Sequence, residues 1–117
     1  MIGLDTNVLL RALLDDQSAE TPRARQLLTE QSSPTAPAFI NHVALCEVLW
    51  VLQRTCRYRK DLLVAAIETL LRTAMFELDG RDVVEEALAM FRSGEADFAD
   101  ALIGVLNRRA GCATTYT

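Results

Sequence analysis

The sequence predicts a single α/β domain of three layers, in which helices cover a short, mainly parallel sheet on both faces. The 117 residues are half hydrophobic and 24% charged, a balance typical of one globular domain. Short apolar runs that end abruptly in polar residues alternate with longer segments of helical period. Strands that alternate with helices favour a parallel sheet, and no internal repeat or long linker divides the chain. We therefore expect one domain over residues 1–117.

The chain opens with an expected strand, a tight turn and two helices. Residues 2–5, Ile-Gly-Leu-Asp, predict a buried strand, and Thr6 and Asn7 are good cap residues for a helix that carries apolar residues to Leu14. Asp-Asp and Ser within residues 15–18 are expected to close that helix and open the next. The second helix is expected over residues 21–31, with proline in its first turn.

The middle of the chain is expected to add a strand and two long helices. Residues 36–40 predict an extended segment whose prolines favour a short or edge strand. Asn41 can cap a helix that continues to about Thr55. After a basic connection, Asp61 is expected to cap a helix over residues 62–72.

The last third is expected to hold a short strand, two helices and the start of another strand. Residues 75–78 predict the strand, which a turn at Asp79-Gly80 ends. Helical spacing follows and stops at Ser93-Gly94, and Asp97 opens a helix to about Ala110. Gly111 fits a helix C-cap, and residues 112–117 predict a β-rich stretch that the chain does not complete.

Composition narrows the classes of function. No apolar run is long enough to span a bilayer, and no export signal follows Met1, so we expect a cytoplasmic protein without a membrane partner. Three cysteines without a Cys-x-x-Cys pair fit reduced thiols. The net charge of −4 is uneven, because residues 1–60 hold seven basic and six acidic side chains and residues 61–117 hold five and ten. A nucleic-acid partner therefore requires a local basic patch or a cation held by carboxylates.

Two acids in the first half are candidate metal ligands. Asp5 directly follows the first expected strand, where it could equally be an N-cap or end the turn. Glu47 is the only charged residue between Val43 and Leu52, so it lies on a helix that is apolar nearly all round and is expected to be mostly buried. A buried carboxylate must be paired, neutralised or coordinated. The alternative for Glu47 is an ion pair with an arginine, or a narrow exposed stripe shared with Arg54.

Two further acids, Asp97 and Asp100, stand three residues apart where the last helix begins. They could serve only as N-cap and first-turn acid. Their largely apolar neighbours instead favour a cation between them, because two unscreened carboxylates repel each other. All four acids are hard oxygen ligands without histidine, a set that suits Mg²⁺ or Mn²⁺ rather than zinc. Such an ion can activate water toward a phosphodiester.

Other chemistries are less well supported. His42 and Cys46 could face each other on one helix, but no orienting acid accompanies them. A zinc site of three cysteines and His42 lacks the paired short spacings. Glycine-rich nucleotide cradles are absent from the sequence. The most concentrated basic patch consists of Arg54, Arg57, Arg59 and Lys60, with Tyr58 among them. It is either a solvated helix end or a surface on which Arg54, Arg57 or Arg59 binds phosphate.

Three segments, in this order, resemble the motifs of PIN-domain proteins. Residues 2–10, Ile-Gly-Leu-Asp-Thr-Asn-Val-Leu-Leu, are similar to the family's first strand and Asp-Thr-Asn turn. Glu47 within residues 44–49 resembles the second acid, and residues 97–103 resemble the third motif, in which Asp100 matches the ligand. Residues 111–117 are similar to the approach to the last motif. The small size and first motif resemble VapC-type toxins in particular.

This resemblance implies a metal-dependent endoribonuclease, the toxin of a toxin–antitoxin pair, that hydrolyses RNA with metal-activated water. It implies Asp5, Glu47 and Asp100 as catalytic metal ligands for Mg²⁺ or Mn²⁺, with Asp97 as an auxiliary acid and Thr6 or Asn7 supporting the first acid. It further implies a homodimer and a VapB-type antitoxin that inserts a basic side chain into the acidic pocket. The family's last strand normally continues into Phe-Asp, a fourth acid, which residues 1–117 lack. The alternative is therefore a catalytically inactive, truncated domain that binds RNA or antitoxin.

Overall fold

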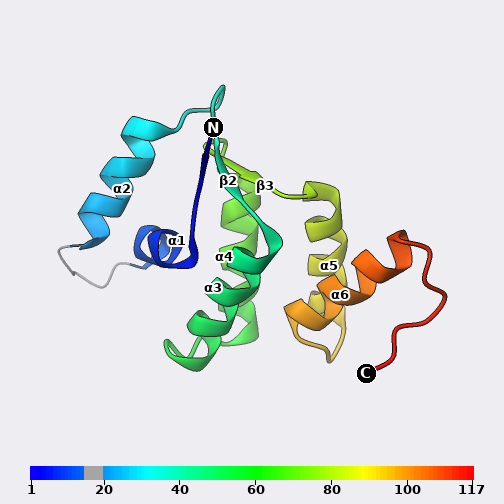
Figure 1. The fold of residues 1–117 in the computed structure, drawn as a ribbon. Helices are drawn as coiled ribbons and strands as arrows, with labels where there is room; N and C mark the ends of the chain where they lie inside the picture. The colour runs from blue at the N-terminus through cyan, green and yellow to red at the C-terminus, as the bar shows by residue number, and fades with distance from the viewer. Residues whose placement is uncertain (15–19) are drawn as a thin grey trace. The chain divides into compact units, whose positions relative to one another are not determined.

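The computed structural model describes residues 1–14 and 20–117, which form two compact units, Met1–Asp79 and Gly80–Thr117 (Figure 1). The first unit contains the described strands and four helices, and the second contains two helices. The helix end and helix start expected within residues 15–18 lie outside the described residues.

A parallel sheet of three short strands organises the first unit. β1 (Ile2–Gly3) pairs with β2 (Ala38–Ile40), and β2 pairs with β3 (Phe76–Leu78), so the strand order is β1-β2-β3. The sequence predicts a short or an edge strand here, and the strand is short while lying at the centre of the sheet. Its prolines precede Ala38, so all three residues of β2 keep the N–H groups that a central strand needs.

Four amphipathic helices connect and cover these strands: α1 (Thr6–Leu13), α2 (Glu20–Gln31), α3 (His42–Arg54) and α4 (Lys60–Arg72). α1 packs against α2 and α3, and α4 packs against α3 and β3. The largest fully buried side chains of this unit are aliphatic and come from α1, β2, α3 and α4; they are Leu9, Ile40, Leu45, Val48, Leu52, Ile67 and Leu70. Their burial fixes the turns that follow β1 and β2.

The helix starts test the predicted caps. Asn41 caps α3, as predicted, and its side-chain oxygen accepts a hydrogen bond from the Ala44 N–H at 2.8 Å. α1 is capped by Asp5 rather than by Thr6 or Asn7, which are already helical. The predicted cap at Asp61 is wrong, because α4 begins at Lys60 after Arg59 and takes Asp61 into its first turn.

The second unit is a pair of packed helices, α5 (Arg81–Ser93) and α6 (Phe98–Arg109). Phe91 and Phe98 meet edge to face with ring centroids 6.1 Å apart. Gly111 has a φ of 103°, and its N–H bonds the Arg108 carbonyl, so it ends α6 as predicted. The β-rich stretch predicted for residues 112–117 is wrong: these residues are exposed and form no strand in the described chain.

Candidate functional site

Asp5 lies at the carboxyl edge of the sheet, between β1 and α1. The Leu4 N–H bonds the Phe39 carbonyl at 2.9 Å, which extends the ladder to the residue before Asp5. The Asp5 Oδ1 then accepts the Val8 N–H at 3.0 Å and caps α1. Asp5 therefore caps α1, which is one of the roles that its place in the sequence allowed. The cap occupies one oxygen of an exposed carboxylate, which leaves the second oxygen able to coordinate a cation.

A hydrogen bond joins this turn to Glu47, 41 residues away in sequence. The Thr6 hydroxyl donates to the Glu47 Oε2 at 3.1 Å, so the first turn of α1 lies against the second turn of α3. Because Thr6 directly follows Asp5, this contact brings Glu47 close to the Asp5 turn. The hydroxyl also fixes the orientation of the Glu47 carboxylate, as a partner of a metal ligand commonly does.

Glu47 is exposed, so the expectation of a mostly buried helix around it is wrong. The buried face of α3 is formed by Ala44, Leu45, Val48, Leu49 and Leu52. The opposite face contains Val43, Glu47, Trp50 and Arg54, of which Val43 is 67% and Trp50 59% exposed. The alternative of an exposed stripe shared with Arg54 describes the helix correctly. An apolar sequence alone did not show that two of its large side chains face solvent.

Asp79 and His42 add polar groups at the ends of the neighbouring strands. The His42 Nε2 lies 2.7 Å from the Asp79 carbonyl oxygen, and its Nδ1 lies 3.8 Å from the Asp79 Oδ2. Sequence reasoning missed this contact, although the signal was present: Asp79 directly follows β3 as Asp5 follows the first strand. The pairing directs His42 toward Asp79, which does not favour a dyad of His42 with Cys46.

Asp97 and Asp100 belong to the second unit, at the start of α6. The Asp97 Oδ1 accepts the Asp100 N–H at 2.8 Å and caps the helix, and both side chains are exposed. The expectation that apolar neighbours bury these acids is wrong, because Phe98, Ala101 and Leu102 point inward while the acids point outward. N-cap and first-turn acid are thus their structural roles. That Asp97 and Asp100 form one metal site with Asp5 and Glu47 stays a prediction.

The donor chemistry of the Asp5–Glu47 pair fits Mg²⁺ or Mn²⁺. Both groups are exposed carboxylates, and each retains an oxygen beyond the one engaged by Val8 or Thr6. Across residues 1–14 and 20–117, no three His, Cys, Asp or Glu side chains stand together as a ready metal cluster, so the pair is a partial ligand set.

The basic patch lies beyond the other end of α3. The Arg54 guanidinium lies 6.0 Å from the Trp50 ring centroid, and Arg59 forms an exposed ion pair with Asp61 at 3.9 Å. Arg57, between them, has a φ of 60°. Arg54 is seven residues from Glu47, or about 10 Å along the helix. The patch is therefore a solvated helix end by its contacts, and phosphate binding there stays a prediction.

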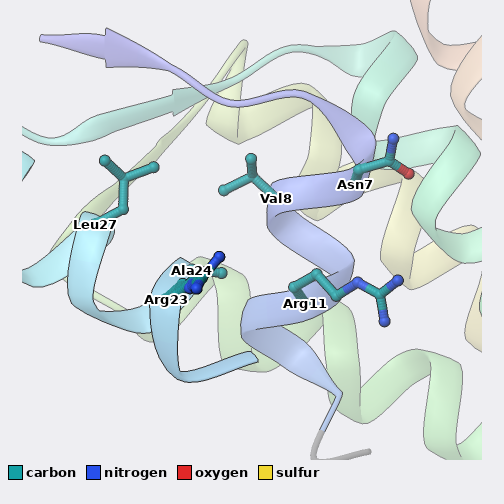
Figure 2. A pocket seen from close by; sticks show the side chains of 6 residues that line it. All are labelled: Asn7, Val8, Arg11, Arg23, Ala24 and Leu27. Carbon is teal, nitrogen blue, oxygen red and sulfur yellow. The ribbon is translucent and has the colours of Figure 1, made fainter. Parts of the chain in front are cut away.

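Sequence reasoning also missed two arginines on the first two helices. Arg11 of α1 and Arg23 of α2 line a cavity together with Asn7, the residue after Thr6 (Figure 2). Arg11 stands one helical turn after Asn7, which was the available signal on α1. Arg23 lies on a different helix, and no spacing rule could pair it with Arg11.

Two further observations concern the cysteines and the hydropathy of the helices. Among the described residues, Cys46, Cys56 and Cys112 form no disulfide. No helix in the described parts of the chain has both the length and the apolar character that crossing a bilayer requires.

A parallel sheet covered by helices, with acidic groups where its strands end, is the architecture of an α/β domain that binds its ligands at the carboxyl edge. The PIN domain family model matches residues 2–116. The chain belongs to the PIN domain family, and its predicted α/β fold class is confirmed.

Two known proteins show how the chain compares within this family. It is 24% identical over 109 residues to a VapC ribonuclease of Aquifex aeolicus (strain VF5), a match that covers 92% of this chain and 79% of that protein. The crystal structure of Mycobacterium tuberculosis VapC20, a sarcin-ricin loop cleaving toxin, matches with a TM-score of 0.50 and 22% identity. That match covers 96% of this chain and 85% of the other. At this identity the structural match supports the fold.

Proposed function

We propose that this chain is a metal-dependent endoribonuclease, the toxin of a toxin–antitoxin pair. The observation that carries the proposal is the hydrogen bond from Thr6 to Glu47, which brings the Asp5 turn and the second acid to one edge of the sheet. Membership of the PIN family and similarity to a protein named VapC ribonuclease support RNA as the substrate.

Asp5, Glu47 and Asp100, with Asp97 as an auxiliary acid, are the residues proposed to hold Mg²⁺ or Mn²⁺. When bound, such an ion lowers the pKa of its water and stabilises the leaving oxygen of a phosphodiester. The chain's own part is orientation. The Val8 N–H holds Asp5, and the Thr6 hydroxyl holds Glu47, so both carboxylates are directed before substrate arrives.

Cleavage of a short single-stranded RNA by the purified chain tests the proposal, with EDTA, Mg²⁺ or Mn²⁺ present. We expect cleavage only with a divalent ion. Glu47→Gln and Asp100→Asn should each lower the cleavage rate by more than about a hundredfold, because mutating even a residue that only orients a metal ligand typically lowers activity ten- to a hundredfold. Glu30→Gln is the matched control, since Glu30 is exposed on α2 and accepts a local hydrogen bond from Gln26.

Two outcomes would redirect the proposal. Unchanged cleavage by both Glu47→Gln and Asp5→Asn would remove the mechanism. RNA binding without cleavage in either ion would favour the alternative, a binding module. A DNA strand of the same sequence, run in parallel, tests the preference for RNA.

We further propose that the chain is a cytoplasmic homodimer neutralised by a VapB-type antitoxin. The support is the similarity to a VapC protein and the acidic edge, to which a basic side chain of an antitoxin is complementary. Light scattering of the purified chain tests the dimer, and inhibition of cleavage by a co-expressed antitoxin tests the partner.

A further inference from the structure

A cavity of about 540 Å³ lies between α1 and α2 (Figure 2). Its lining comes from Asn7, Val8 and Arg11 of α1 and from Arg23, Ala24 and Leu27 of α2. The volume falls within the roughly 300–1,000 Å³ of small-ligand sites. The Arg25 Nε donates to the Ala12 carbonyl at 3.4 Å, a contact that links the two helices forming the walls.

The lining combines apolar and cationic groups. Val8, Ala24 and Leu27 provide apolar surface, and each helix adds one arginine, Arg11 on α1 and Arg23 on α2. Figure 2 shows the Arg11 guanidinium on the side of α1 that carries Asn7. A guanidinium is planar and matches the oxygens of a phosphate with two parallel hydrogen bonds. A nucleotide carries the complementary pair of features, a flat base with apolar faces and an anionic phosphate.

The cavity and the candidate acidic site share the first turn of α1. Asn7 lines the cavity and directly follows Thr6, whose hydroxyl holds Glu47. Asn7 and Arg11 share one face of the helix, and Figure 2 shows both side chains extending from the same side of α1. They lie about 6 Å apart along the axis. One RNA strand can therefore contact both the acid pair and the cavity.

We propose that the α1–α2 cavity is an RNA subsite that holds the nucleotide next to the cleaved linkage. Arg11 and Arg23 bind phosphates of the strand, and the base of this nucleotide lies against Val8 and Leu27. This inference rests on the proposed nuclease function and adds how the substrate strand is positioned. It assigns RNA binding to two arginines outside the basic patch of Arg54, Arg57 and Arg59.

The test measures binding of a short fluorescein-labelled single-stranded RNA by anisotropy in EDTA, over a series of salt concentrations. We expect Arg11→Gln and Arg23→Gln each to weaken binding about tenfold. Each should also reduce the slope of log affinity against log salt by about 0.7, because each removes one phosphate contact. Arg72→Gln is the matched control: Arg72 is an exposed arginine of the same unit that precedes β3, at the opposite edge of the sheet.

The proposal would be overturned if the double variant Arg11→Gln/Arg23→Gln kept the RNA affinity and the salt slope of the wild type. It would also be overturned if Arg72→Gln lost as much RNA affinity as the cavity variants, because the loss would then reflect net charge alone. If the double variant fails to fold, Arg11→Lys and Arg23→Lys carry the test. Weaker binding with an unchanged slope supports the bidentate role, and unchanged binding overturns it. Poly-glutamate serves as a competitor: displacement by it while the glutamine variants retain RNA affinity would assign the cavity to an acidic peptide and overturn the proposal.

Binding and cleavage separate this inference from the proposed function. Arginine variants that bind and cleave as the wild type does would refute the subsite and leave the nuclease intact. A chain that binds RNA through these arginines without cleaving it would refute the nuclease and leave the cavity as an RNA-binding site only.

Discussion

Replacement of Asp5 separates its structural role from its proposed chemical one. Asp5→Ala removes the acceptor that caps α1 through the Val8 N–H, and loss of such a cap costs about 1 kcal/mol. For a chain of this size that is a fall in melting temperature of about 4–6 °C. Asp5→Asn keeps a side-chain oxygen that can cap the helix but removes the negative charge, so we expect a melting temperature within about 1 °C of the wild type.

The same two variants should have equally low cleavage activity. Neither retains a carboxylate at position 5, so both should lose cleavage of single-stranded RNA in Mn²⁺ to the same extent. Circular dichroism melting gives the stability and gel electrophoresis of the products gives the activity. A fall in melting temperature in Asp5→Asn as large as in Asp5→Ala would refute the assignment of the cap. Retained cleavage in Asp5→Asn would refute the chemical role.

Three further predictions concern other contacts. Thr6→Val removes the hydroxyl that orients Glu47 while keeping its shape, and should lower kcat/KM for RNA about tenfold, with Thr6→Ser near the wild type; equal activity of the two variants would contradict this. Arg57 has a φ of 60°, so Arg57→Gly should raise the free energy of unfolding in urea by up to about 1 kcal/mol, and a decrease would contradict the strain. Arg109 hydrogen-bonds Asp82 and thereby holds the pKa of Asp82 below its ordinary value. The contribution of this pair is present above the unfolded pKa and is lost as the pH falls through the lower, folded pKa. Acidification from pH 5 should therefore destabilise the wild type more than Arg109→Gln in thermal melts, and an equal loss would contradict the pairing.

Local signals in the sequence predicted most of the elements. Asn41, Gly111 and the abrupt ends of the apolar runs each act within a few residues, so their structural roles follow from their neighbours. Sequence reasoning fell short where a distant segment decides. The central place of β2 depends on strands at both ends of the first unit, and the exposure of Glu47 depends on which face of α3 meets the core.

The candidate site shows the same division. Motif spacing identified Asp5 and Glu47, and the structure supplies their link through Thr6. No spacing rule predicted the cavity that Arg11 and Arg23 share, because its two walls meet only in the folded chain. Asp97 and Asp100 were identified by spacing as well, and their local geometry accounts for the cap of α6 alone.

The matching starts of α1 and α3 affect the charge of the site. Both helices begin immediately after paired parallel strands, capped by Asp5 and Asn41, so their first-turn amides gather at one edge of the sheet. Each helix start carries a positive partial charge of roughly half a unit. Together they offset part of the negative charge of Asp5 and Glu47. An approaching phosphate is therefore repelled less at this edge than the two carboxylates alone would dictate.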